Sequence, residues 1–104
     1  MAILGNPFVA NVTKQMTNDE TIQAIRVDIA GELEAIIGYE AHAMSTDDER
    51  VKKVLFHIAD EERQHVGELQ QLLYILCPKE LEHVEKGKQE IIKQQQQNFQ
   101  GQLQ

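Results

Sequence analysis

Apolar residues recur at three- and four-residue steps along the first half of the chain, and this is the period of an amphipathic α-helix. The first such stretch contains Ile22, Ile25, Ile29, Leu33 and Ile36. Thr17 precedes it and is followed three residues later by Glu20, the spacing of a capping box at a helix start. The pattern therefore predicts a helix from about Thr17 to about Met44.

A second apolar stretch follows after a short polar join. It contains Val51, Val54, Leu55, Ile58, Val66, Leu69, Leu72, Leu73 and Leu76. Thr46 and Glu49 have capping-box spacing, so we expect a second helix over residues 47–77. Because the join is short, the two helices should form an antiparallel hairpin.

The rest of the chain predicts a thinner third helix and two flanking segments. Pro78 ends the second helix, and a sparse apolar stripe then indicates a helix over about 79–95. We interpret residues 1–16 as an N-terminal arm, 17–95 as the helical domain and the glutamine-rich residues 96–104 as a flexible tail. The fold class is all-α. One hairpin cannot enclose a sizeable core, so we expect dimerisation to complete a four-helix bundle.

Composition excludes several classes of partner. The net charge of −7 and the absence of tryptophan argue against nucleic acid and anionic membranes as partners. The longest apolar run, residues 72–77, is too short to span a bilayer. The first residues lack the features of a signal peptide. A single cysteine, Cys77, excludes an internal disulfide and is typical of a reducing cytoplasm.

Three ionisable residues interrupt the apolar stripes of the two long helices. Glu32 lies inside the first stripe, and Glu62 and His65 lie inside the second. Glu62 and His65 are three positions apart, so both side chains project from one face of the helix. Buried carboxylates are paired, protonated or bound to metal, and Arg26 and Arg63 lie off the centres of the stripes.

Di-iron and di-manganese bundles use this arrangement of ligands. They take one Glu from each of two helices and Glu-x-x-His from each of the other two. This chain has one of each, so two chains supply the complete set. Carboxylates with one imidazole per ion suit iron or manganese, and we predict a di-iron centre formed in a dimer.

At these residues the chain resembles the ferritin-like superfamily and, more closely, the encapsulated ferritins. The resemblance covers about residues 26–78 and includes the segments 32–35 and 60–65. It implies that Glu32, Glu62 and His65 form a ferroxidase centre across a dimer interface, with Tyr39 beside it and Glu34 in an acidic entry site. It also implies a ring of dimers that is loaded into an encapsulin shell, where the oxidised iron is stored.

The leading functional hypothesis is a ferroxidase that oxidises Fe(II) to Fe(III) for iron storage or detoxification, in the cytoplasm and inside an encapsulin nanocompartment. Two enzymatic alternatives are a rubrerythrin-like peroxidase and a di-iron hydroxylase of the quinone-modifying type. One cysteine excludes the rubredoxin module that many rubrerythrins carry. A third alternative is a non-enzymatic helical interaction protein whose Glu and His residues form a buried polar network.

Overall fold

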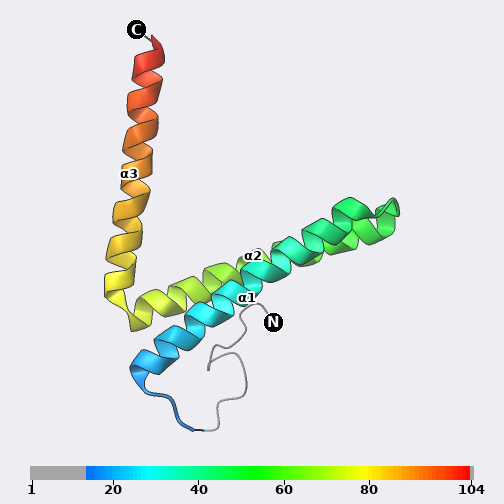
Figure 1. The fold of residues 1–104 in the computed structure, drawn as a ribbon, viewed down its shortest axis with the longest axis horizontal. Coiled ribbons are helices and arrows are strands. Elements are labelled where there is room, and N and C mark those ends of the chain that lie inside the picture. Colours follow the sequence, from blue (N-terminus) through cyan, green and yellow to red (C-terminus); the bar gives the residue numbers. More distant parts are fainter. Residues whose placement is uncertain (1–13, 104) are drawn as a thin grey trace.

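The computed structural model describes residues 14–103, and this part of the chain forms three α-helices and no strand. They are α1 (Asn18–Ser45), α2 (Glu49–Leu76) and α3 (Pro78–Leu103). Figure 1 shows α1 and α2 side by side as an antiparallel hairpin, with α3 leading steeply away from the end of α2. The predicted all-α hairpin with a C-terminal helix is therefore confirmed. The predicted N-terminal arm lies mostly outside the described residues, which begin at residue 14.

The start of α1 matches the predicted capping box. The Thr17 hydroxyl accepts a hydrogen bond from the Glu20 N–H at 3.2 Å, and the Glu20 carboxylate accepts one from the Thr17 N–H at 3.0 Å. These bonds satisfy backbone donors that have no partner inside the helix. The bond from the Thr17 N–H also lowers the pKa of Glu20.

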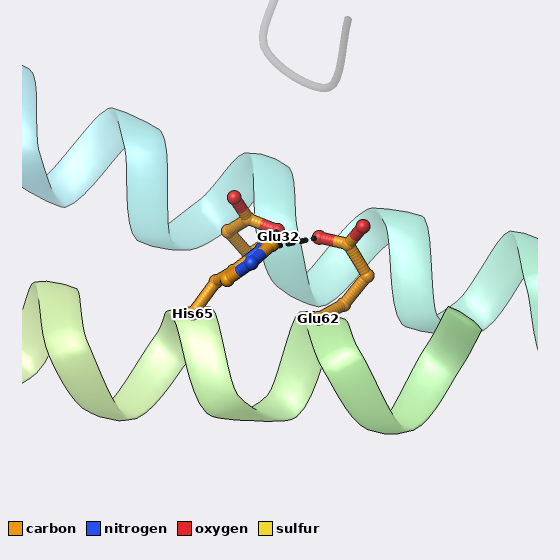
Figure 2. A group of neighbouring side chains, drawn as sticks. All are labelled: Glu32, Glu62 and His65. Carbon is orange, nitrogen blue, oxygen red and sulfur yellow. Dashed lines mark hydrogen bonds and ion pairs between the residues drawn. The ribbon is translucent and has the colours of Figure 1, made fainter. Parts of the chain in front are cut away.

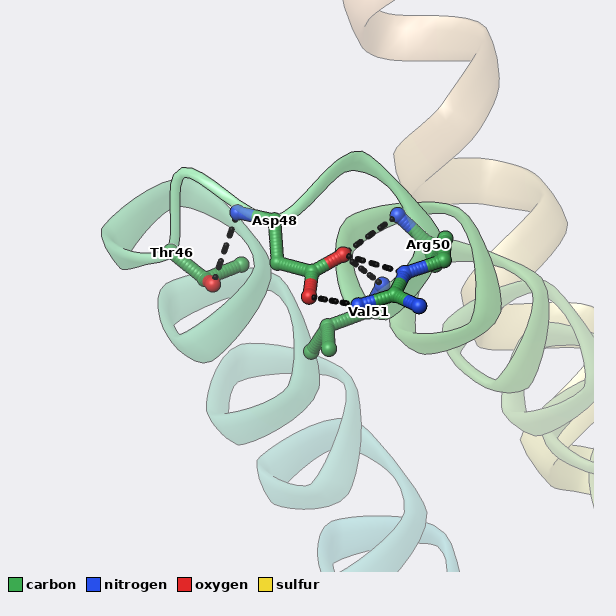
Figure 3. Close-up of polar contacts among 4 residues, drawn as sticks. All are labelled: Thr46, Asp48, Arg50 and Val51. Carbon is green, nitrogen blue, oxygen red and sulfur yellow. Dashed lines mark hydrogen bonds and ion pairs between the residues drawn. The ribbon is translucent and has the colours of Figure 1, made fainter.

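The predicted cap of α2 is wrong, because Asp48 and not Thr46 begins this helix. The Asp48 carboxylate accepts from the backbone N–H groups of Arg50 at 2.9 Å and Val51 at 3.4 Å (Figure 3). The Thr46 hydroxyl instead accepts from the Asp48 N–H at 3.2 Å. A carboxylate caps this helix better than a hydroxyl, because its negative charge interacts favourably with the positive end of the helix dipole. The Asp48 carboxylate also accepts hydrogen bonds from the Arg50 guanidinium.

The third helix is longer than predicted and extends to Leu103, so residues 96–103 are helical and do not form a separate tail. Glutamine is a good helix former and no proline follows Pro78, so nothing local stops the helix at residue 95. The described side chains beyond Glu80 are all exposed. Among the described residues, the one ion pair that joins α3 to α1 is Arg26–Glu80, at 2.6 Å.

The core of the hairpin is small, and its large buried side chains lie at the open end. At the open end Ile22, Ile25 and Leu73 are buried together, and Ile29, Leu69, Leu76 and Cys77 pack against them. Nearer the turn, Ala43 and Ala59 have no exposed surface. Their small side chains allow the two helices to approach closely.

Much apolar surface remains uncovered in the single chain. Among the described residues, thirteen large hydrophobic side chains are exposed and five hydrophobic residues are buried. Exposed examples are Val54 (55%), Leu72 (43%) and Ile75 (65%), all on α2. A protein that folds as a stable monomer rarely leaves a contiguous apolar face of this kind open. None of the described helices combines the length and the hydropathy that a transmembrane segment needs.

Candidate metal centre

Three of the predicted site residues meet midway along the hairpin. Glu32 comes from the middle of α1, and Glu62 and His65 come from α2, about one helical turn apart. Figure 2 shows the three side chains converging between the two helices. The His65 Nδ1 atom lies 3.4 Å from Glu62 Oε2 and 3.6 Å from Glu32 Oε2. One donor atom from each residue lies within 4.8 Å of the others, close enough for one cation to bind all three.

The cluster is sheltered on one side and open on the other. The side chains of Glu62 and Glu32 are 18% and 26% exposed, whereas that of His65 is 48% exposed. At about 100° per residue, His65 falls between Val54 and Ile58 on the exposed apolar face of α2. The imidazole therefore lies where a second protein surface would cover both the apolar face and the metal ligands.

Within residues 14–103, no arginine or lysine pairs with the two carboxylates of the cluster. Among the described residues, Arg63 pairs with Glu40 at 2.6 Å and Arg26 pairs with Glu80 at 2.6 Å, both away from the cluster. Hydrogen bonds to these partners raise the pKa of each arginine. The negative charge of Glu32 and Glu62 is thus left for a cation, or for His65 when it is protonated.

The donor set fits iron or manganese. Two carboxylates and one imidazole are the ligand types that such ions share in helical bundles, while a structural zinc site would contain thiolates. Three protein ligands do not complete a di-metal site, since that site needs the same set from a second pair of helices. The residues present therefore fit one half of a di-iron centre.

Two further predicted site residues lie outside the cluster. Tyr39 is half-buried and follows Glu32 by one heptad on the same side of α1. Glu34 is exposed, and its position two residues after Glu32 turns it away from the hairpin contact. The single chain does not bring Glu34 to the three ligands, so its role in cation entry stays a prediction.

Sequence reasoning missed a polar contact between α1 and α2 on the flank opposite to the cluster. Arg63 joins α2 to Glu40 on α1, and its second terminal nitrogen lies 3.0 Å from Asp60 Oδ1. The three-residue spacing of Asp60 and Arg63 was visible in the sequence as a helical ion pair. The partner on α1 was not, because it depends on how the two helices are packed.

Comparisons with known proteins agree with this fold. A family model described as the ubiquinone biosynthesis protein COQ7 matches residues 19–77. The chain is 39% identical over 82 residues to the encapsulin nanocompartment cargo protein EncC of Myxococcus xanthus, which covers 79% of this chain and 63% of that relative. It is 38% identical over 86 residues to a ferritin-like–encapsulin shell fusion protein of Pyrococcus furiosus, covering 83% of this chain and 25% of the relative. The chain thus spans less than two thirds of the length of these two relatives.

A solved structure also matches over most of its length. The crystal structure of the encapsulated ferritin domain from Pyrococcus furiosus aligns with a TM-score of 0.77 and 38% sequence identity. The alignment covers 85% of this chain and 90% of that domain, so nearly the whole domain is represented here. The chain therefore belongs to the encapsulated ferritin family of the ferritin-like superfamily.

Proposed function

We propose that this protein is a ferroxidase, which binds Fe(II) at a di-iron centre between two subunits and oxidises it to Fe(III) for storage or detoxification. The observation that carries the proposal is the convergence of Glu32, Glu62 and His65, whose donor atoms lie within 4.8 Å of one another, with no arginine or lysine partner in the described part of the chain. Each Fe(II) gives up one electron, and oxygen or peroxide accepts it.

The chain's own residues favour this oxidation by electrostatics. Two carboxylates interact more favourably with Fe(III) than with Fe(II), because the product ion carries one more positive charge. Their partial burial strengthens this preference, since less water screens the charges. His65 contributes a neutral nitrogen ligand in its unprotonated form, so it completes the ligand set without adding charge.

A second copy of the chain completes the site. One chain offers one candidate ligand on α1, Glu32, and the Glu-x-x-His pair Glu62 and His65 on α2, and a di-iron bundle uses each of these sets twice. The exposed apolar face around His65 is the surface that the second copy would bury. We therefore infer a homodimer, and the resemblance to encapsulated ferritins favours a ring of such dimers.

The names of the relatives support association with an encapsulin shell. Two relatives from Myxococcus xanthus are cargo proteins of encapsulin nanocompartments, and the Pyrococcus furiosus relative is fused to shell protein. We infer that this chain is likewise held inside such a compartment. Co-expression with an encapsulin shell protein, followed by size-exclusion chromatography, should place the chain in the shell fraction. Elution apart from the shell would contradict this assignment.

The match to COQ7 favours a second candidate function, hydroxylation of a quinone-like substrate at the same centre. The two functions differ in what is consumed. A hydroxylase would convert a quinone precursor when supplied with reductant and oxygen, whereas a ferroxidase would consume Fe(II) with no organic substrate. A chain that binds no iron would instead support the non-enzymatic interaction protein.

The test of the proposed function is Fe(II) oxidation by ligand variants, followed by absorbance of the ferric product. Glu32→Ala, Glu62→Ala and His65→Ala should each remove most of the activity, while circular dichroism shows helicity to be retained. His57→Ala and Glu61→Ala are matched controls, because this Glu–His pair at 2.8 Å lies on α2 outside the cluster. Full activity in His65→Ala would exclude His65 from the centre. Native mass spectrometry should also show about one iron per chain, and only in the oligomer.

A further inference from the structure

An ion pair joins α1 and α2 on the flank of the hairpin opposite to the metal cluster. Arg63 Nη2 lies 2.6 Å from Glu40 Oε2. At about 100° per residue, Arg63 and His65 lie on either side of the buried residues Ala59 and Leu73, which face α1. Glu40 and Glu32 likewise lie on either side of the buried contact line of α1.

We propose that Arg63 is a positioning residue, which holds α2 at the rotation about its axis that brings Glu62 and His65 opposite Glu32. This inference rests on the proposed function, since it concerns the same site. A rotation of α2 that breaks the pair on one flank necessarily moves Glu62 and His65 on the other, because helical neighbours turn together.

The guanidinium is well suited to hold such a position. Both of its terminal nitrogens are engaged, Nη2 by Glu40 and Nη1 by Asp60 at 3.0 Å. Asp60 lies on α2, one turn before Arg63, so it restricts the conformations of the guanidinium before the pair between helices forms. A planar fork with several donors fixes direction better than a lysine ammonium does.

Few large, fully buried side chains fix the rotation of α2 at this level of the hairpin, where Ile29 and Leu69 are half-buried. The large buried side chains Ile22, Ile25 and Leu73 lie at the open end, and the residues buried nearer the turn are the two small alanines, Ala43 and Ala59. In the described part of the chain, two ion pairs join α1 to α2: Arg63–Glu40 and the cluster contact His65–Glu32. The first therefore pre-arranges the second before metal binds.

The pair should affect the site far more than the stability of the fold. Its side chains are 48% and 33% exposed, and partly exposed ion pairs contribute little to the free energy of unfolding. Displacement of a reacting group by about 1 Å, in contrast, can lower a rate by about 100-fold. We expect Arg63→Ala to bind Co(II), a spectroscopic substitute for Fe(II), about tenfold more weakly than the unmodified chain.

The matched control is Arg50→Ala, which removes the same side chain and charge. Arg50 pairs with Asp48 at the start of its own helix and does not bridge α1 and α2. Titration of the oligomer with Co(II), followed by its visible absorption, should show weaker binding and a changed band shape for Arg63→Ala only. Arg63→Lys should recover part of the affinity, and the exchange Glu40→Arg with Arg63→Glu should recover most of it. If only the positive charge of Arg63 mattered, its removal would strengthen Co(II) binding. The direction of the change in affinity therefore separates the effect of charge from the effect of position.

A metal-free measurement keeps this inference separate from the proposed function. Spin labels at Gly31→Cys on α1 and Gln70→Cys on α2, with Cys77→Ser, report the distance between helices when labelled chains are diluted with unlabelled ones. We expect Arg63→Ala to broaden the distance distribution and Arg50→Ala to leave it narrow. If the unmodified chain binds no Co(II), the proposed function fails and this distance alone decides the role of Arg63. Equal distributions in the two variants, or equal Co(II) binding where binding occurs, would overturn the inference.

Discussion

Two neighbouring leucines on α2 separate the folding of one chain from its association with another. Leu73 is 4% exposed and belongs to the buried cluster with Ile22 and Ile25, whereas Leu72 is 43% exposed on the open apolar face. The same substitution, Leu→Ala, therefore acts on different equilibria at the two positions. Leu73→Ala should destabilise each chain, and Leu72→Ala should weaken the proposed dimer, on which the proposed metal centre depends.

The magnitudes follow from burial. Removal of a buried leucine side chain costs about 2–5 kcal/mol, so Leu73→Ala should lower the free energy of unfolding by about 3 kcal/mol. Complete burial of a leucine is worth about 1.5–3 kcal/mol, and covering the 43% of Leu72 that is still exposed contributes about 1 kcal/mol per chain. A symmetric dimer contains this contact twice, so Leu72→Ala should cost about 2 kcal/mol, or about 30-fold in the dissociation constant.

Sedimentation velocity over a range of protein concentrations measures this difference. Leu72→Ala should shift the dissociation midpoint to higher concentration, and Fe(II) oxidation per chain should fall at the same concentrations because the half-sites separate. Leu73→Ala should lower the melting temperature at every concentration. Equal melting curves for the two variants, with association unchanged in Leu72→Ala, would refute the assignment of the open face to the dimer.

Three further predictions concern the metal, the helix caps and α3. Removal of metal by a chelator should shift the oligomer toward smaller species at neutral pH, because facing carboxylates repel across an empty interface and bound cations favour the assembled state. Unchanged sedimentation with chelator would mean that apolar packing alone holds the dimer. Hydrogen bonds from Arg50 lower the pKa of Asp48, so its ionised form stabilises the fold at pH values above its ordinary unfolded-state pKa, and this contribution is lost as the pH falls through the lowered folded-state pKa. The Asp48→Asn variant, measured by urea unfolding, should therefore lose less free energy of unfolding between about pH 5 and pH 2 than the unmodified chain does. An identical loss would contradict the stabilising role of the Asp48 carboxylate. Arg26→Gln should increase trypsin cleavage within α3 several-fold while the melting temperature changes little, since the 39%-exposed Arg26 side chain on α1 makes the ion pair to Glu80 on α3; unchanged cleavage would show that packing at Cys77 and Pro78 holds α3.

Local features of the sequence were sufficient to predict the hairpin. The period of the apolar residues and the Thr17–Glu20 capping box predicted α1 to within one residue at each end. The chemistry of the cluster was also readable, because a carboxylate inside an apolar stripe has few stable environments. The cap of α2 and the end of α3 were mispredicted, although both depend on local chemistry: Asp48 competes better than Thr46 for backbone donors, and glutamines continue a helix.

Contacts between the helices were decided only by the tertiary structure. Helical period predicts which face of α1 or α2 is apolar, but not the rotation or the level at which two faces meet. That packing brings His65 to within 3.6 Å of Glu32, and it pairs Arg63 with Glu40 across the hairpin. It also leaves Leu72 open beside the buried Leu73. The sequence by itself therefore determined where the helices of the hairpin lie and which residue types, glutamate and histidine, stand in their apolar stripes. The packing of α1 on α2 decided which side chains meet, because contacts between residues distant in sequence depend on how the two helix faces fit together.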